Sequence, residues 1–141
     1  MLWSDFQDTA DRLVVGQTEG DWRSAVSRTY YAVFHYFREF FLAHGIDVGR
    51  SGQSHNSLST GLLNCGLPSV VPFGRRFDRL RTDRTTADYN FRRPVDRTLA
   101  RNAVRAGRAI AVVFQTLLGQ MPTVQIIAAV RRYLLSIGRI P

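Results

Sequence analysis

Apolar positions along the chain recur every three or four residues, which is the spacing of one face of an α-helix. The alternation typical of a half-buried strand is not found. Turn-forming residues separate the helical stretches, which we expect at about 4–15, 21–44, 54–64, 73–90 and 95–119, with a short sixth from 122. The best-placed capping residues for the first three are Ser4, Asp21 and Ser54.

This pattern predicts an all-α protein, an antiparallel helical bundle with four to five main helices plus a short C-terminal helix. The length of 141 residues suits one domain. We expect residues 1–121 to form the bundle and residues 122–141 to be a C-terminal helical extension of the same domain.

The second expected helix is rich in aromatic residues and has two different faces. Its core face should contain Val26, Tyr30, Val33, Phe37, Phe40 and Phe41. A polar stripe runs along another side and contains Arg28, Tyr31, His35 and Arg38. The stripe is either ordinary helix surface or the lining of a cleft that receives a phosphate or nucleotide.

The fifth expected helix has an apolar seam and an arginine stripe. The seam has heptad-like spacing and consists of Leu99, Ala103, Ala106, Ile110, Val113 and Leu117. The opposite face carries Arg97, Arg101, Arg105 and Arg108 with no acidic residue among them. This stripe is either the solvated side of the bundle or a surface that faces phosphates.

The net charge of +8 is concentrated in one part of the chain, because residues 75–108 contain eleven arginines and four aspartates. Such a block indicates a phosphate-bearing partner or a solvated surface. A single Cys65 excludes a disulfide framework, and no uninterrupted apolar stretch reaches the roughly 20 residues of a membrane span. We therefore expect a cytoplasmic protein that does not enter membranes.

The sequence contains no recognisable constellation for metal or cofactor binding. The three histidines and the cysteine lack ligand spacing, and no phosphate loop or nucleophile motif is found. We expect neither a metal nor a cofactor.

Residues 25–45, AVSRTYYAVFHYFREFFLAHG, carry a family resemblance. They resemble the second helix of the HEPN superfamily (higher eukaryotes and prokaryotes nucleotide-binding domain), particularly its small stand-alone prokaryotic members. In that family a histidine then opens the next helix, and an R-x-x-A-D-Y segment follows. The matching positions in this chain are Ala25, Ser27, Arg28, Tyr30, Tyr31, Ala32, Phe34, His35, His55, Arg84, Ala87, Asp88 and Tyr89. The resemblance covers about residues 4–118.

The resemblance implies a HEPN-type helical bundle that forms a homodimer and binds RNA or a nucleotide. Many members are metal-independent ribonucleases or toxins, often encoded beside a minimal nucleotidyltransferase antitoxin. The ribonuclease members carry an arginine and, after four to six residues, a histidine close to the dimer cleft. We expect surplus apolar surface on the second and fourth helices to form the dimer contact.

The chain departs from that motif, because Tyr89 stands where the histidine belongs in Arg84-Thr-Thr-Ala-Asp-Tyr89. A phenol with a pKa near 10 is a poor general base at neutral pH. Another Arg-x4-His match, from Arg50 to His55, spans a loop and a helix start. The candidate catalytic residues are Arg84, Tyr89 and His55. The candidate RNA- or nucleotide-binding residues are Arg28, Tyr31, His35, Arg81, Asp88, Arg97, Arg101 and Arg105.

Two questions remain open at this point. Arg84 is either an intrahelical partner of Asp88, a phosphate-binding arginine in a cleft, or a buried structural charge. The protein is either a toxin-like protein directed at RNA, paired with a nucleotidyltransferase, or a non-catalytic nucleotide- or protein-binding module that has lost the ribonuclease histidine.

Overall fold

The computed structural model describes all 141 residues and contains helices and no strands. Its six helices are α1 (Trp3–Val14), α2 (Glu19–Ala43), α3 (Gly52–Leu63), α4 (Val71–Tyr89), α5 (Arg97–Leu118) and α6 (Thr123–Ser136). The expected all-α bundle is confirmed, and each helix lies within a few residues of its expected position.

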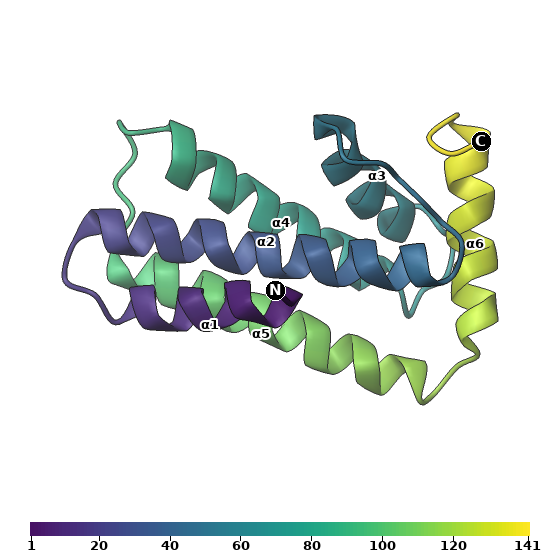
Figure 1. The fold of residues 1–141 in the computed structure, drawn as a ribbon, viewed down its shortest axis with the longest axis horizontal. Coiled ribbons are helices and arrows are strands. Elements are labelled where there is room, and N and C mark those ends of the chain that lie inside the picture. Colours follow the sequence, from purple (N-terminus) through teal and green to yellow (C-terminus); the bar gives the residue numbers. More distant parts are fainter.

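The bundle is organised around α2, which contacts α1, α3, α4 and α5. Figure 1 shows α1, α2, α4 and α5 running along the long axis, while α3 and α6 lie toward one end. The helix α6 packs against α3, and its buried residues include Ile126, Val130 and Leu134. The C-terminal segment therefore covers one side of α3.

The caps of the first three helices lie earlier than expected. Thr18, not Asp21, caps α2: its Oγ1 accepts from the amide of Asp21 at 3.1 Å, and the Asp21 carboxylate accepts from the amide of Thr18 at 3.3 Å. This is a reciprocal capping box, so Asp21 occupies its third position. Ser4 and Ser54 also lie inside their helices, which begin at Trp3 and Gly52.

Aromatic side chains fill the centre of the core. Tyr30, Phe37 and Phe41 of α2 are fully buried together with Phe77 of α4 and Phe114 of α5. The ring centroid of Phe37 lies 5.1 Å from that of Phe114 and 5.7 Å from that of Phe77. Burying each such side chain contributes about 1.5–3 kcal/mol to folding, so this cluster fixes α2, α4 and α5 against one another.

The face that α5 buries is rotated from the expected seam. Its buried residues are Ala100, Ala103, Val104, Gly107, Ile110, Ala111 and Phe114. A methyl group at Gly107 would collide with the hydroxyl of Thr29, so a glycine there permits close approach to α2. The expected seam residue Val113 is 43% exposed and its neighbour Val112 is 63% exposed. On α5, Val112 and Val113 therefore add uncovered apolar surface to that of Leu42 on α2 and Tyr89 on α4.

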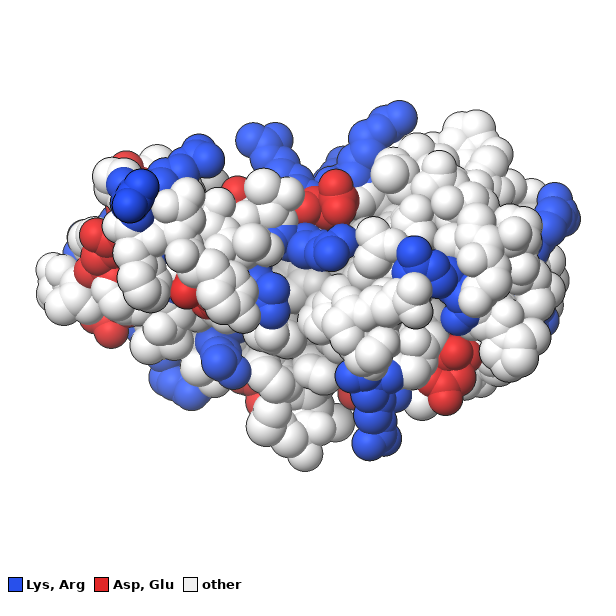
Figure 2. All heavy atoms as spheres, turned by 90° about the horizontal axis from the view of Figure 1, so that it is seen from above, with Lys and Arg blue, Asp and Glu red and all other residues white.

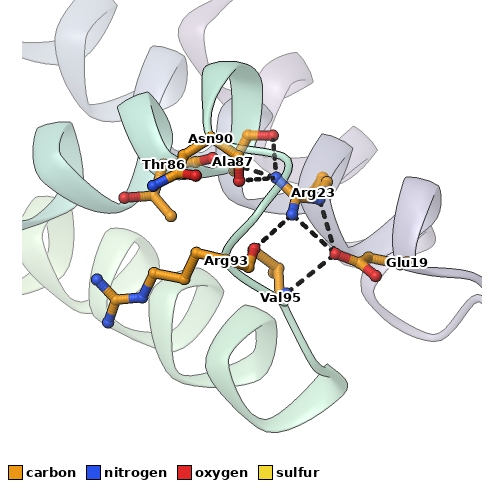
Figure 3. Close-up of polar contacts among 7 residues, drawn as sticks. All are labelled: Glu19, Arg23, Thr86, Ala87, Asn90, Arg93 and Val95. Carbon is orange, nitrogen blue, oxygen red and sulfur yellow. Dashed lines mark hydrogen bonds and ion pairs between the residues drawn. The ribbon is translucent and has the colours of Figure 1, made fainter.

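Arg23 of α2 anchors the connection between α4 and α5 by hydrogen bonds (Figure 3). Its guanidinium donates to the main-chain carbonyls of Thr86, Ala87, Asn90 and Arg93 at 2.6–3.2 Å. Its Nε also donates to Glu19 at 2.9 Å, and the same Glu19 oxygen accepts from the amide of Val95 at 3.1 Å. One side chain therefore satisfies the C-terminal carbonyls of α4 and anchors the chain that follows.

No single helix is both long and apolar enough to cross a membrane. The pair α5 and α6 meets the criterion of length and composition only when taken together, with a bend of 115° between them.

Candidate functional site

Arg84 of α4 points toward α2 and is held there by polar contacts. Its Nη2 donates to the hydroxyl of Tyr31 at 2.6 Å, and its Nε lies 3.2 Å from Oδ2 of Asp88. That Nε–Oδ2 contact is an ion pair without hydrogen-bond geometry. Ser27 of α2 donates to the same Asp88 oxygen at 3.1 Å. The arrangement fixes the arginine between two helices.

Three tyrosine rings surround the Arg84 guanidinium. Its carbon lies 5.2 Å from the ring centroid of Tyr31, 5.4 Å from that of Tyr30 and 5.7 Å from that of Tyr89. The side chain is 17% exposed, yet its Nη1 makes no hydrogen bond within the chain and is not among the buried unpaired atoms. One N–H edge therefore remains free for an anionic ligand.

His55 lies in the first turn of α3 and faces the same region. Its ring stacks on Phe34 with centroids 4.0 Å apart, and its Nδ1 is 2.6 Å from the hydroxyl of Tyr30. That buried hydroxyl has no other partner, so it donates to Nδ1. Burial, followed by the charges of Arg84 and Arg81, lowers the pKa of His55 to about 4. The ring is neutral at pH 7.

Phe6 of α1 completes one side of the site. Its ring stacks on that of His35 at a centroid distance of 5.0 Å, and burial lowers the pKa of His35. The exposed Arg28 places its guanidinium 5.8 Å from the Phe6 ring and 5.9 Å from the Tyr31 ring. Neither Phe6 nor Ser27 is among the site residues predicted from the sequence, although Ser27 belongs to the family segment on α2.

The structure thus brings seven of the candidate residues together, and we name this group the Arg84 cluster: Arg28, Tyr31, His35, His55, Arg81, Arg84 and Asp88. Arg28 and Arg81 have no ion-pair partner in the chain. Figure 2, which views the molecule from above Figure 1, shows arginine side chains and a small group of carboxylates around a hollow near the middle of this face. The cluster carries an excess of positive charge.

Tyr89 lies at the edge of the cluster, 72% exposed at the end of α4. It meets Arg84 through its ring face, and its hydroxyl has no hydrogen-bond partner in the chain. Arg50 is exposed in the loop before α3.

The arginines of α5 have separate roles and no contact with the Arg84 cluster. Arg97 donates to the carbonyl of Gly16 at 3.2 Å and to Gln17 at 3.0 Å, and it lies over the ring of Trp22. Arg108 forms an ion pair with Asp11 of α1, so the expectation of a stripe without acidic partners is wrong at that position. Arg101 and Arg105 are exposed and unpaired.

The alternatives for Arg84 can be weighed from this geometry. The residue is the intrahelical partner of Asp88, but it is also mostly buried and oriented by Tyr31 from another helix. An arginine fixed in this way, with one edge free, can bind a phosphate oxygen. The cluster does not offer a good general base. The Nδ1 of His55 already accepts from Tyr30, and Tyr89 lacks an activating partner. No group of three or more histidine, cysteine or acidic side chains is placed to hold a metal ion.

Comparison with known proteins agrees with the helical architecture. A family model described as HEPN domain matches residues 8–115, which includes all of α2, α3 and α4 and most of α5. Comparisons with curated proteins and with solved structures find no significant match. Because the match covers most of the 141 residues, the chain belongs to the HEPN domain family.

Proposed function

We propose that this HEPN protein binds RNA by its phosphates at the Arg84 cluster. The observation that carries the proposal is the orientation of Arg84, whose Nη2 is held by Tyr31 at 2.6 Å while Nη1 stays free. A guanidinium fixed before binding loses little conformational entropy when a phosphate arrives. The unpaired Arg28 and Arg81 add charge beside it.

The proposed biological role is that of the toxin-like member of a pair with a minimal nucleotidyltransferase antitoxin. HEPN membership and the basic cluster support a role that involves RNA. Expression in a bacterial host should then arrest growth, and co-expression of a minimal nucleotidyltransferase encoded beside this protein should restore growth. Arg84→Gln should relieve the arrest without the antitoxin.

A non-catalytic binding module is the second candidate, and the state of the two candidate general bases favours it. His55 is neutral at pH 7 with a pKa of about 4, and its Nδ1 already accepts from Tyr30. Tyr89 replaces the ribonuclease histidine. If purified protein binds single-stranded RNA but leaves it uncut after prolonged incubation, the binding module is the correct description.

We also propose a homodimer formed through α5. Val112 and Val113 are 63% and 43% exposed and line a groove between α1 and α5. Val113 also lines a groove between α4 and α5. Arg76, Arg79 and Arg93 line the same groove. Pairing of two copies here would cover the valines and produce an arginine-lined dimer cleft. Light scattering should give twice the chain mass, and Val112→Glu with Val113→Glu should return it to the monomer mass.

The test of RNA binding compares two arginine variants. Fluorescence anisotropy with labelled single-stranded RNA should show that Arg84→Gln loses about tenfold or more in affinity, since charge-assisted contacts contribute about 1.5–3 kcal/mol. The control is Arg132→Gln, which removes an exposed arginine of α6 outside the cluster. Equal affinities for the two variants, with Arg84→Gln still folded, would remove Arg84 from the site.

A further inference from the structure

We propose that the end of α4 and the turn after it form a seat for an unpaired nucleobase, with Tyr89 and Phe91 as its stacking surfaces. This inference rests on the proposed binding of RNA at the Arg84 cluster. It adds a second element of recognition, because phosphate contacts do not distinguish a nucleic acid from another polyanion.

The first observation is the exposure of two aromatic rings. Tyr89 is 72% exposed and Phe91 is 78% exposed. They line a shallow hollow of about 470 Å³ together with Thr85, Thr86, Asn90 and Arg92. Exposed aromatic rings in a basic surface are the usual platform for bases of single-stranded nucleic acids.

The second observation is that each ring has one face on an arginine. The guanidinium of Arg84 lies 5.7 Å from the Tyr89 centroid, and that of Arg23 lies 5.5 Å from the Phe91 centroid. A cation on one face holds the ring in place. The high exposure of both rings leaves their other faces open to a planar ligand.

The third observation is that the segment is fixed before any ligand binds. Arg23 holds the carbonyls of Thr86, Ala87, Asn90 and Arg93, so its hydrogen bonds lie on both sides of Phe91 (Figure 3). Glu19 binds Arg23 and the amide of Val95. A stacking surface on such an anchored turn requires little ordering on binding.

The chemistry of the hollow indicates a base attached to a phosphate backbone. The hydroxyls of Thr85 and Thr86 and the amide of Asn90 surround the rings and can meet the polar edge of a base. Arg92 lines the hollow, and Arg84 links it to the cluster. Bases in a duplex are already stacked on one another, so the seat fits single-stranded RNA and excludes duplex RNA.

The experiment measures the binding of fluorescein-labelled decanucleotides of each of the four RNA bases by anisotropy. A decamer of the abasic ribose-phosphate backbone is the matched probe without bases. The variants are Phe91→Ala, Phe91→Leu and Arg84→Gln. Val124→Ala is the control, because Val124 is 76% exposed on α6 and lies outside the seat.

Phe91→Ala should weaken binding of the best RNA decamer by about fivefold or more, as expected when one base loses its aromatic platform. Phe91→Leu should weaken it nearly as much, because leucine keeps apolar area but has no ring. Neither variant should change the affinity for the abasic probe, whereas Arg84→Gln should weaken both probes. Val124→Ala should change nothing.

Equal affinities of wild type and Phe91→Ala for every RNA decamer would overturn the base seat, while a loss in Arg84→Gln would leave phosphate binding intact. If the wild type binds none of the probes, both proposals fail. If Phe91→Ala instead converts a dimer into a monomer in light scattering, the rings are covered by a second copy and the base seat is wrong.

Discussion

The Nη2 of Arg84 donates a 2.6 Å hydrogen bond to the hydroxyl of Tyr31, and this bond joins α4 to α2 at the centre of the basic cluster. The adjacent tyrosines of α2 therefore have different partners. Tyr30 is fully buried and donates to His55, whereas Tyr31 is half-buried and accepts from Arg84. The first orients a histidine of α3, and the second orients the arginine.

Tyr31→Phe should lower both stability and RNA affinity. It removes the acceptor that orients Arg84, and a hydrogen bond to a charged group contributes about 1.5–3 kcal/mol. Thermal unfolding and anisotropy measure the two effects. The control is Tyr36→Phe, because the hydroxyl of Tyr36 accepts from Gln115 at 2.8 Å on another side of α2. That variant should lose stability but bind RNA normally; the same affinity in both variants would contradict an orienting role for Tyr31.

Stability should fall as the pH drops from about 6.5 to about 4. In that range an unfolded histidine binds a proton, whereas folded His55, with its pKa lowered to about 4, stays neutral. The unfolded state therefore gains a proton that the folded state lacks, and the contribution of His55 to the loss levels off below pH 4. Melting temperatures across this range should depend less on pH in His55→Gln. An unchanged pH profile in that variant would show that other groups cause the loss.

Two changes on α5 should have different consequences. Arg97→Gln breaks the contacts to Gly16 and Gln17 and should cost about 1–2 kcal/mol. Replacing Arg101 and Arg105 together with glutamine should leave the free energy of unfolding within about 0.5 kcal/mol. If RNA also reaches this side, the double variant should reduce the slope of log affinity against log salt by about 1.4. An unchanged slope would make the exposed pair ordinary surface.

Gly74→Ala should destabilise the protein through the crossing of α3 and α4. A methyl group there would lie 2.7 Å from the Cα of Leu63, and main chain cannot move aside as a flexible side chain does. A cost of about 1–3 kcal/mol is expected from such overpacking. Gly52→Ala is the matched control, because nothing lies within 4 Å of the added methyl. It should stabilise by about 0.4–1 kcal/mol, and equal melting temperatures for the two variants would contradict the close crossing.

The periodicity of the sequence was sufficient to predict the helices, because each has an apolar face and a clear end. It was less reliable for which side of a helix is covered. On α5 the spacing of Val113 fits a core seam, but coverage depends on where α1, α2 and α4 lie around it, and Val113 is exposed. The heptad pattern alone contains no information on that placement.

For the candidate site, too, the sequence predicts features within one helix better than contacts between helices. The helical periodicity predicts Arg28, Tyr31 and His35 as a stripe on one helix, and the resemblance to the R-x-x-A-D-Y segment adds Arg84 and Asp88. Phe6 was not predicted, because its contact with His35 is made between two helices, and the periodicity of a single helix does not reveal such a contact. Arg97 was expected to face phosphates, yet it binds the carbonyl of Gly16, a main-chain acceptor that no side-chain pattern reveals.

The position of α6 has a consequence for how the site can respond to events elsewhere on the molecule. Its residues Val130 and Leu134 pack beside Gly61 of α3, and Tyr133 bonds with Thr60 at 3.3 Å. His55 lies five residues before Thr60 on α3, and its Nδ1 bonds with Tyr30 of α2. A molecule that binds the outer face of α6 would therefore displace α3. This displacement would reach His55 without direct contact between that molecule and the histidine.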